Sequence, residues 1–297
     1  MFCRLEDTHL RRRLREKLST DLSSEELSCI YNSFDIIGDI AIIKVSNEKV
    51  VNAEVVAKQI MAVHRSVKTI FAQASPIVGD FRVRELRLLA GSGETCTKHR
   101  ESGCVFEVDV GKCYFSPRLS YERSRIAGLV KSNETVVNMF AGVGCFSIII
   151  AKTVPETKVF SIDVNPTAIE YMERNVKLNR VYGKVTPLLG DSKDVIHAQL
   201  QHKADRVLMP LPEKALAYLP HAVSALQPSG GWIHLYDFQH AKGNEDPVEK
   251  TKLIVAQKLS SIGVGYDFAF SRVVRSIGPN WYQTALDIRV DFLPSKF

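Results

Sequence analysis

The chain has 297 residues, of which 45% are hydrophobic and 24% are charged, with 17 glycines and 12 prolines. This balance is that of an ordinary globular protein and excludes disordered, collagen-like and low-complexity chains. The length favours two domains, each able to bury its own core. Lysine and arginine outnumber aspartate and glutamate by 39 to 33, and the net charge of +6 is compatible with a nucleic-acid partner without proving one.

The sequence gives no sign of export or of membrane insertion. It lacks an apolar run of the roughly 18 residues that a membrane-spanning helix needs, and its start lacks the apolar core of a secretion signal. We therefore expect a soluble, cytoplasmic monomer without a membrane partner. Cys96, His99, Cys104 and Cys113 are of the residue types that bind zinc, but they lack the spacing of a second half-site. We therefore expect no metal, and no disulfides.

Residues 1–103 are interpreted as a small α+β domain. Five basic residues lie within Arg11–Lys17 and indicate either a solvated helix face or an RNA contact. Two apolar runs around Gly38 and Asp39 predict a hairpin over residues 34–45. Apolar residues at helical spacing predict a helix over residues 52–67. Strand-like segments follow at residues 68–73, 81–89 and 104–110.

Residues 104–297 form the second predicted domain, in which strand and helix patterns alternate from residue 114 onward. Such alternation implies a mainly parallel sheet with right-handed crossovers. Two last β-like runs, residues 268–277 and 282–292, flank a Gly-Pro-Asn turn and predict a terminal antiparallel hairpin. The other predicted strands cover residues 135–140, 158–163, 184–189, 205–209 and 231–238, and an amphipathic helix covers residues 166–179.

Three consecutive strand ends carry the residues of a nucleotide-like site. The first strand runs into the turn of residues 138–147, where Gly142 and Gly144 allow a ligand to approach the backbone. The second strand ends at Asp163, whose carboxylate can accept hydrogen bonds from both hydroxyls of a ribose. The third ends at Asp191, which can reach an adenine amino group. Because the turn lacks a third glycine and a Walker lysine, the pattern favours S-adenosylmethionine over NAD and ATP.

Five segments of the chain resemble archaeal and eukaryotic tRNA (guanine-N1)-methyltransferases, which modify guanosine 37 beside the anticodon. They read FRVREL, YFSPRLSYERSRI, NMFAGVGCFSI, IDVNPTAIE and DRVLMPLP, and the resemblance covers roughly residues 30–292. It implies a class I, Rossmann-like α/β methyltransferase domain with a terminal antiparallel hairpin, preceded by a small α+β domain that contacts RNA. It also implies S-adenosylmethionine as the cofactor and tRNA as the partner.

The resemblance assigns roles to individual residues. Guanine N1 is a poor nucleophile until it loses its proton, so the reaction needs a general base and a group that neutralises charge on O6. Glu122 matches the family's base, and Arg82, from the smaller domain, matches the arginine that stabilises O6. Tyr114 and Arg118 match residues beside the target base and the cofactor. The implied cofactor-binding residues are Arg123, Asn138, Phe140, Ala141, Gly142, Gly144, Asp163, Val164, Asp191, Ser192 and Pro210.

Two positions depart from the family pattern. Asn138 stands where the family often has aspartate, which keeps a hydrogen-bonding side chain but removes a charge. Pro210 begins a Pro-Leu-Pro motif where the best-known members read Asn-Leu-Pro. Because proline has no side-chain amide with which to contact guanine, the identity of the product is less constrained than that of the cofactor.

The leading hypothesis is therefore methylation of N1 of guanosine 37 in tRNA. One alternative is methylation of a tricyclic wyosine intermediate at the same position, alone or in addition, and another is wyosine-pathway aminocarboxypropyl transfer. A hypothesis from another class is an inactive tRNA-binding protein. Taken singly, Glu122 and Arg123 could also be ordinary surface charges near the start of a helix, where the dipole favours glutamate.

Overall fold

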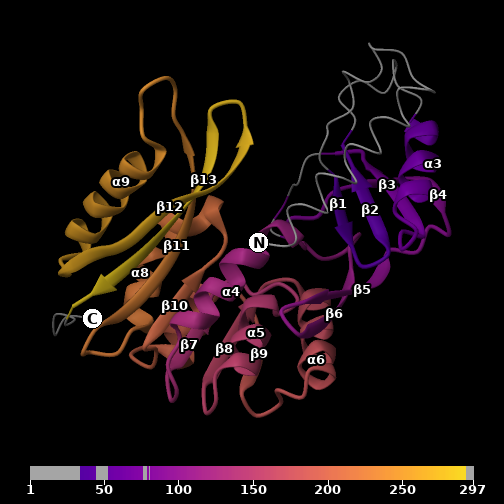
Figure 1. Ribbon diagram of the computed structural model, residues 1–297. Coiled ribbons are helices and arrows are strands. Elements are labelled where there is room, and N and C mark those ends of the chain that lie inside the picture. The colour runs from indigo at the N-terminus through magenta and orange to yellow at the C-terminus, as the bar shows by residue number, and fades with distance from the viewer. Residues whose placement is uncertain (1–33, 45–52, 76–78, 80, 292–297) are drawn as a thin grey trace. The chain divides into compact units, whose positions relative to one another are not determined.

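The computed structural model describes residues 34–44, 53–75, 79 and 81–291, which form two compact units (Figure 1). Of the described residues, those up to 101 and residues 105–119 form one unit, and residues 102–104 and 120–291 form the other. The expected domain boundary lies at residues 103 and 104, whereas the first unit of the structure runs on to Leu119. The basic segment Arg11–Lys17 lies outside the described residues.

The first unit contains a four-stranded sheet in the order β1-β2-β3-β4. The predicted hairpin is confirmed as the antiparallel pair β1 (Asp35–Ile37) and β2 (Ile40–Ile43). The predicted helix is confirmed as α3 (Ala53–Val63), which leads to β3 (Thr69–Gln73), parallel to β2. The helix packs its apolar face on the sheet, in a core that includes Val56, Ile60 and Ile70.

Two segments of this unit differ from the prediction. Residues 81–85 are not part of a strand, because Arg82 has a left-handed backbone (φ +53°) and its N–H bonds back to the carbonyl of Gly79 at 3.2 Å. The strand β4 (Leu86–Gly91) begins only after this turn and pairs antiparallel with β3. The sequence also did not predict β5 (Cys96–Glu101), which forms a two-stranded sheet with β6 (Cys104–Asp109).

The second unit is built on a seven-stranded sheet in the order β12-β13-β11-β10-β7-β8-β9. Strands β11, β10, β7, β8 and β9 are parallel, and β13 and β12 are antiparallel to their neighbours. The expected Rossmann-like sheet of a class I methyltransferase, with its terminal antiparallel hairpin, is therefore confirmed. The strands are β7 (Thr135–Asn138), β8 (Lys158–Asp163), β9 (Val185–Leu189), β10 (Arg206–Met209), β11 (Gly231–His240), β12 (Tyr266–Gly278) and β13 (Trp281–Val290).

Helices cover both faces of this sheet. Helices α4 (Ser120–Leu129) and α5 (Cys145–Thr153) lie side by side on one face, and α8 (Ala215–Ala225) packs behind it with α9 (Pro247–Ile262) (Figure 1). The shorter or peripheral elements are the 3₁₀ turn η1 (Pro117–Leu119) of the first unit, and α6 (Pro166–Leu178), α7 (Ser192–Val195), the π-helical turn η2 (Ile196–Leu200) and the 3₁₀ turn η3 (Pro212–Lys214) of the second.

Local chemistry explains where α6 begins. The side chain of Asn165 accepts a hydrogen bond from the backbone N–H of Thr167 at 3.0 Å, and Pro166 occupies the first helical turn, where its missing N–H costs nothing. The predicted helix over residues 166–179 is thus confirmed. No helix among the described residues is both long enough and apolar enough to cross a membrane.

Asp237 is a buried carboxylic acid in β11, and it yields a test of the packing. It lies on the same side of the strand as the core residues Ile233 and Leu235. Burial raises the pKa of Asp237 to about 6, although the backbone N–H of Phe238 stabilises the charged form in part. The folded protein therefore binds this proton more tightly than the unfolded chain does, and its stability falls as the pH rises from about 4 to 6.

We expect the substitution Asp237→Asn to stabilise the protein at pH 7.5 by up to about 3 kcal/mol, because it removes a buried charge. Near pH 4 the gain should be small, since the native carboxyl is then already protonated. Thermal unfolding followed by circular dichroism at the two pH values measures both effects. An equal change of Tm at both pH values would contradict the raised pKa of Asp237.

Candidate active site

The carboxyl ends of the parallel strands are tied together by short hydrogen bonds. The N–H of Gly142, in the turn after β7, donates to Oδ2 of Asp163 at 2.6 Å. The hydroxyl of Ser192, after β9, donates to the carbonyl of Met139 at 2.6 Å. These bonds bring the predicted cofactor residues of three separate strand ends to one edge of the sheet.

Asp163 is the half-buried residue around which the turn is organised. Its Oδ1 accepts a second backbone hydrogen bond, from Asn165 at 2.9 Å. Burial raises the pKa of Asp163, while the N–H groups of Asn165, Gly142 and Val164 favour its charged form. A carboxylate has about four lone-pair sites, so both oxygens keep the capacity to accept a ligand hydroxyl. The side chain of Val164 beside it is exposed and apolar.

Asp191 is fixed on both of its oxygens. Its Oδ1 caps α7 by accepting the N–H of Lys193 at 3.0 Å, and its Oδ2 accepts the hydroxyl of Tyr218 at 2.8 Å. The ring of Tyr218, which comes from α8, lies 5.3 Å from the ring of Phe140, edge to face. The sequence offered no signal for Tyr218. Pro210 directly follows β10 and is half-buried.

Asn138 is a fully buried polar residue at the end of β7. Its Nδ2 donates to Oγ of Ser147 on α5 at 3.1 Å. Its Oδ1 is buried and has no hydrogen-bond partner among the described residues. Buried polar atoms are nearly always paired, so such an oxygen indicates a place where a ligand or a water donates a hydrogen bond.

Gly144 is required by the packing of the turn against α6. Its backbone is left-handed (φ +91°), and a Cβ added there would lie 2.7 Å from Cγ of Met172 on α6. The turn thus rests closely on α6 at Gly144, and the expectation that both glycines admit a ligand stays a prediction. Ala141, on the same turn, is buried, and its N–H donates to the carbonyl of Ile162 at 2.9 Å.

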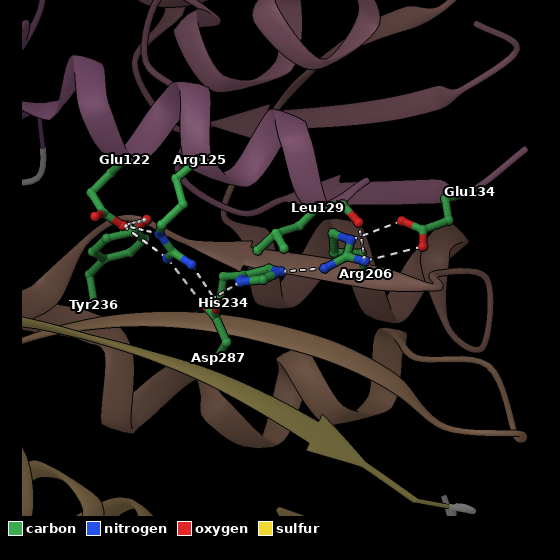
Figure 2. Close-up of polar contacts among 8 residues, drawn as sticks. All are labelled: Glu122, Arg125, Leu129, Glu134, Arg206, His234, Tyr236 and Asp287. Carbon is green, nitrogen blue, oxygen red and sulfur yellow. Dashed lines mark hydrogen bonds and ion pairs between the residues drawn. The ribbon is translucent and has the colours of Figure 1, made fainter. Parts of the chain in front are cut away.

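Glu122 lies at the start of α4 and is almost fully buried, with 1% of its surface exposed. Its Oε2 accepts three hydrogen bonds, from Nε and Nη2 of Arg125 at 3.0 and 2.9 Å and from the hydroxyl of Tyr236 at 2.9 Å (Figure 2). Its Oε1 has no hydrogen-bond partner among the described residues, and Nη1 of Arg272 lies 3.5 Å away. Arg123 is also buried, so neither residue is an ordinary surface charge.

The contacts of Glu122 continue from strand to strand beneath α4 as a buried network (Figure 2). Arg125 donates to Asp287 with Nη1 at 2.5 Å and Nη2 at 3.1 Å, and Nδ1 of His234 lies 2.6 Å from Oδ1 of the same Asp287. On its other side, Nε2 of His234 lies 2.6 Å from Nη1 of Arg206, which pairs with Glu134.

The protonation of this network follows from its geometry. A guanidinium can only donate, so Nε2 of His234 accepts from Arg206, and the proton of the ring sits on Nδ1 and is donated to Asp287. Burial lowers the pKa of His234 and keeps the ring neutral. Burial alone would raise the pKa of Asp287, but hydrogen bonds from His234 and Arg125 lower it to about 2. Sequence reasoning missed Arg125, His234, Tyr236 and Asp287.

Three predicted catalytic residues belong to the first unit. The guanidinium of Arg82 lies 4.3 Å from the ring centroid of Tyr114, within the range of a cation–π contact. Nε of Arg118 donates to Oδ1 of Asp35 on β1 at 2.6 Å. The roles of Arg82, Tyr114 and Arg118 toward the target base stay predictions. Among the described residues, no group of three or more His, Cys, Asp or Glu side chains is arranged to hold a metal.

Comparison with known proteins decides the family. Residues 97–262 match the TRM5/TYW2 methyltransferase domain, and residues 14–95 match the TYW2 N-terminal domain. The chain belongs to the TRM5/TYW2 methyltransferase family. The resemblance drawn from the sequence motifs is thereby confirmed.

Relatives within this family carry different named activities. Trm5b of Pyrococcus abyssi, a tRNA (guanine(37)-N(1))-methyltransferase, is 42% identical over 88% of this chain and 75% of its own. Taw21 of Saccharolobus solfataricus, a tRNA 4-demethylwyosine(37)-methyltransferase, is 36% identical over 88% of this chain and 95% of its own. A tRNA(Phe) (4-demethylwyosine(37)-C(7)) aminocarboxypropyltransferase of Methanocaldococcus jannaschii is 33% identical over 86% and 96%.

Solved structures of TRM5/TYW2 proteins share the fold over most of the chain. The crystal structure of Trm5b from P. abyssi superposes with a TM-score of 0.80 at 41% identity, covering 91% of this chain and 78% of that one. The complex of aTrm5 with tRNALeu gives 0.79 at 35% identity, covering 95% and 79%. P. horikoshii TYW2 in complex with MeSAdo gives 0.76 at 27% identity, covering 95% and 99%.

Members of the TRM5/TYW2 family use S-adenosylmethionine, and the residues of this chain fit that cofactor. Asp163 offers carboxylate oxygens for the ribose, and Asp191 lies at the end of the adjacent strand with its carboxylate fixed by Tyr218. The buried Oδ1 of Asn138 supplies an unpaired acceptor at the end of β7. These are the polar groups that a nucleoside needs at the carboxyl edge of a parallel sheet.

The packing role of Gly144 can be separated from its backbone strain. Gly183 has a similar left-handed backbone (φ +83°), but a Cβ there would meet nothing within 4 Å. We expect Gly183→Ala to destabilise the protein by about 1 kcal/mol through strain alone. Gly144→Ala should cost about 1–3 kcal/mol more because of the contact with Met172. Urea unfolding of the two variants measures the difference, and equal losses would refute the packing role.

Asp163 can be tested by cofactor binding alone. We expect Asp163→Asn to weaken the binding of S-adenosylmethionine about 10- to 100-fold, because a charged acceptor of hydrogen bonds is lost. Isothermal titration calorimetry without tRNA measures the affinity. Asp267→Asn, which removes an exposed charge from β12, is the control that should bind normally. An unchanged affinity in Asp163→Asn would overturn the ribose assignment.

Proposed function

We propose that this protein methylates N1 of guanosine 37 in tRNA, with S-adenosylmethionine as the methyl donor. The observation that carries the proposal is the buried carboxylate of Glu122, in which one oxygen accepts three donors and the other accepts no hydrogen bond from the described part of the chain. The 42% identity to a tRNA (guanine(37)-N(1))-methyltransferase supports the reaction, and the relative solved in complex with tRNALeu supports tRNA as the partner.

Methylation of guanine N1 needs a general base, whereas the methyl donor needs no further activation by the protein. When bound, S-adenosylmethionine supplies a methyl group whose bond to the positively charged sulfur breaks, with its electron pair staying on sulfur, as the new bond to N1 forms. Glu122 takes the proton of guanine N1 on Oε1, which leaves an electron pair on N1 for that bond. Arg82 neutralises the charge that develops on O6, and Tyr114 and Arg118 contact the target base.

The remaining site residues hold the cofactor in this proposal. Asp163 accepts hydrogen bonds from the ribose, and Asp191 accepts one from the adenine amino group. Val164 and Phe140 supply apolar surface, and Arg123 contacts the methionine end. Asn138, Ala141, Gly142, Gly144, Ser192 and Pro210 form the wall of the pocket at the strand ends. Holding donor and acceptor in line supplies a large part of the rate enhancement.

A second candidate is methylation of 4-demethylwyosine at position 37, alone or beside guanosine methylation. Two observations favour it: residues 14–95 match the TYW2 N-terminal domain, and Taw21 is matched over 95% of its length. Pro210 in place of the asparagine of other members points the same way. Because an aminocarboxypropyltransferase is 33% identical to this chain, transfer of an aminocarboxypropyl group is a third candidate reaction.

The product of the reaction separates these candidates. Unmodified tRNA transcripts with guanosine or adenosine at position 37, and tRNA carrying 4-demethylwyosine, are incubated with the protein and S-adenosylmethionine. Mass spectrometry of the nucleosides should show 1-methylguanosine from the guanosine transcript and none from the adenosine transcript. A product only on 4-demethylwyosine would replace the first proposal with the second, with the mass increment distinguishing methyl from aminocarboxypropyl. No product on any of them would favour a binding protein.

Replacing the base gives a matched test. Glu122→Gln keeps the shape of the side chain but cannot take a proton, so we expect methyl transfer to slow at least about 100-fold. The affinity for S-adenosylmethionine should be unchanged. Glu173→Gln, at an exposed position on α6, is the control that should keep full activity. Wild-type rates in Glu122→Gln would remove this residue as the base.

A further inference from the structure

The two oxygens of Glu122 have different surroundings. Oε2 accepts three donors, two from Arg125 and one from Tyr236, at 2.9 to 3.0 Å. A carboxylate oxygen has two lone-pair sites, so three donors leave no capacity for a proton. Oε1 accepts no hydrogen bond among the described residues. The carboxylate is therefore held by one oxygen, and the other, although buried, keeps its capacity to accept a hydrogen bond or a proton.

We propose that Tyr236 and Arg125, backed by Asp287, are positioning residues that fix Glu122 through Oε2 and leave Oε1 as the atom that accepts the substrate proton. This inference rests on the proposed function of Glu122 as the base. Tyr236 and Arg125 act through Glu122 and not on the substrate itself.

Asp287 shares the positive charge of Arg125 with Glu122. An arginine that pairs with a single carboxylate favours its charged form so strongly that the carboxylate becomes a weak proton acceptor. Here the guanidinium is shared, because Arg125 also donates two hydrogen bonds to Asp287, at 2.5 and 3.1 Å. The positive charge of Arg125 is thus divided between two carboxylates. Arg125 therefore orients Glu122 while only part of its positive charge acts on that carboxylate.

Tyr236 remains a donor at every working pH. Burial, with the charge of Glu122 nearby, raises the pKa of Tyr236 well above its usual range, so the hydroxyl keeps its proton. Asp287 is in turn held by the neutral ring of His234, its direct cross-strand neighbour in the antiparallel pair β11–β13. The base is therefore supported from α4, β11 and β13 at once.

Four elements bring charged or titratable groups to Glu122 among the described residues. They are Arg125 on α4, Tyr236 on β11 with His234 behind Asp287, Asp287 itself on β13, and Arg272 on β12. Arg272 is one-third exposed, stacks 4.7 Å over the ring of Tyr121, and stands 3.5 Å from Oε1. A cation at this distance attracts the carboxylate without occupying the lone pair that takes the proton.

At one end of the network Arg206 joins elements of the fold, whereas the hydroxyl of Tyr236 at the other end does not. Arg206 donates to the carbonyl of Leu129 at 3.0 Å and to Glu134 at 2.8 and 3.1 Å, and so ties the end of α4 to β10 (Figure 2). Removing these contacts would loosen the fold. Loss of the Tyr236 hydroxyl leaves all of them in place, which makes this hydroxyl the sharpest point at which to test positioning.

The test is the pH dependence of methyl transfer in a single turnover, with saturating S-adenosylmethionine and the substrate identified above. In Tyr236→Phe the carboxylate of Glu122 loses one of its three donors, and hydrogen bonds to a carboxylate favour its charged form. The acid limb of the rate profile should therefore move up by about one pH unit. The ratio of the rates at pH 5.5 and pH 8 should fall several-fold. Cofactor affinity should not change.

Asp287→Asn should shift the profile in the opposite direction. Arg125 then pairs with one carboxylate alone, and a nearby opposite charge favours the charged form of a carboxylate. The acid limb of the rate profile should therefore move to lower pH, and the rate at pH 8 should fall. Tyr266→Phe, a tyrosine on β12 outside the network, is the control with an unchanged profile. Opposite shifts of the two variants are a signature that loss of structure alone does not produce.

The outcomes separate this inference from the proposed function. If Glu122→Gln is slow but Tyr236→Phe and Asp287→Asn leave the acid limb unmoved, the base stands and the positioning inference fails. If Glu122→Gln itself transfers methyl groups at the wild-type rate, the assignment of the base fails first. Shifts of both variants in one direction would also overturn the division of charge proposed for Arg125.

Discussion

One guanidinium, that of Arg125, bonds to two carboxyl groups that are buried inside the second unit. Glu122 and Asp287 are both buried, and an isolated charge in such a place is far more costly than any single hydrogen bond can offset. Arg125 meets both of them, and the neutral ring of His234 completes the shell of Asp287. Such clusters contribute little net stability compared with apolar packing, so their persistence calls for another explanation. Holding one carboxylate oxygen in place while leaving the other unpaired is such an explanation.

Carboxylates are used in a similar way at the edge of the sheet where we expect the cofactor to bind. Asp163 accepts the N–H groups of Gly142 and Asn165, and Asp191 accepts the N–H of Lys193 and the hydroxyl of Tyr218. In each case the protein uses part of the carboxylate to build its own turn and leaves acceptor capacity toward the ligand. Both sites are thus preorganised by the chain, so little rearrangement is needed when the ligand binds.

The sequence predicted the elements whose information is local. The strand β8 was predicted at both ends because its β-type residues Val159, Phe160 and Ile162 lie between a lysine and an acidic residue that close the segment. β5 was missed because CTKHRE has no apolar alternation, and residues 81–85 were misassigned because nothing in the letters indicates the left-handed backbone of Arg82. Asp163 and Asp191 could be located from their place at strand ends. Arg125 and Asp287 could not be paired, since 162 residues separate them and only the antiparallel hairpin brings them together.

What distinguishes one product from another within this family must be local, because relatives with three different named activities match most of this chain at 33% to 42% identity. In the proposed mechanism Glu122 meets the need of guanine N1 for a base, and residues that contact the rest of the target ring can still favour one substrate over another. The end of β10 is placed to do so. Pro210 offers neither a side-chain amide nor a backbone N–H, and only its carbonyl can meet a substrate. If Pro210 faces the target base, an acceptor alone at that point favours a base that presents a donor there, and it accepts a fused ring against which the amide of an asparagine would be left unpaired.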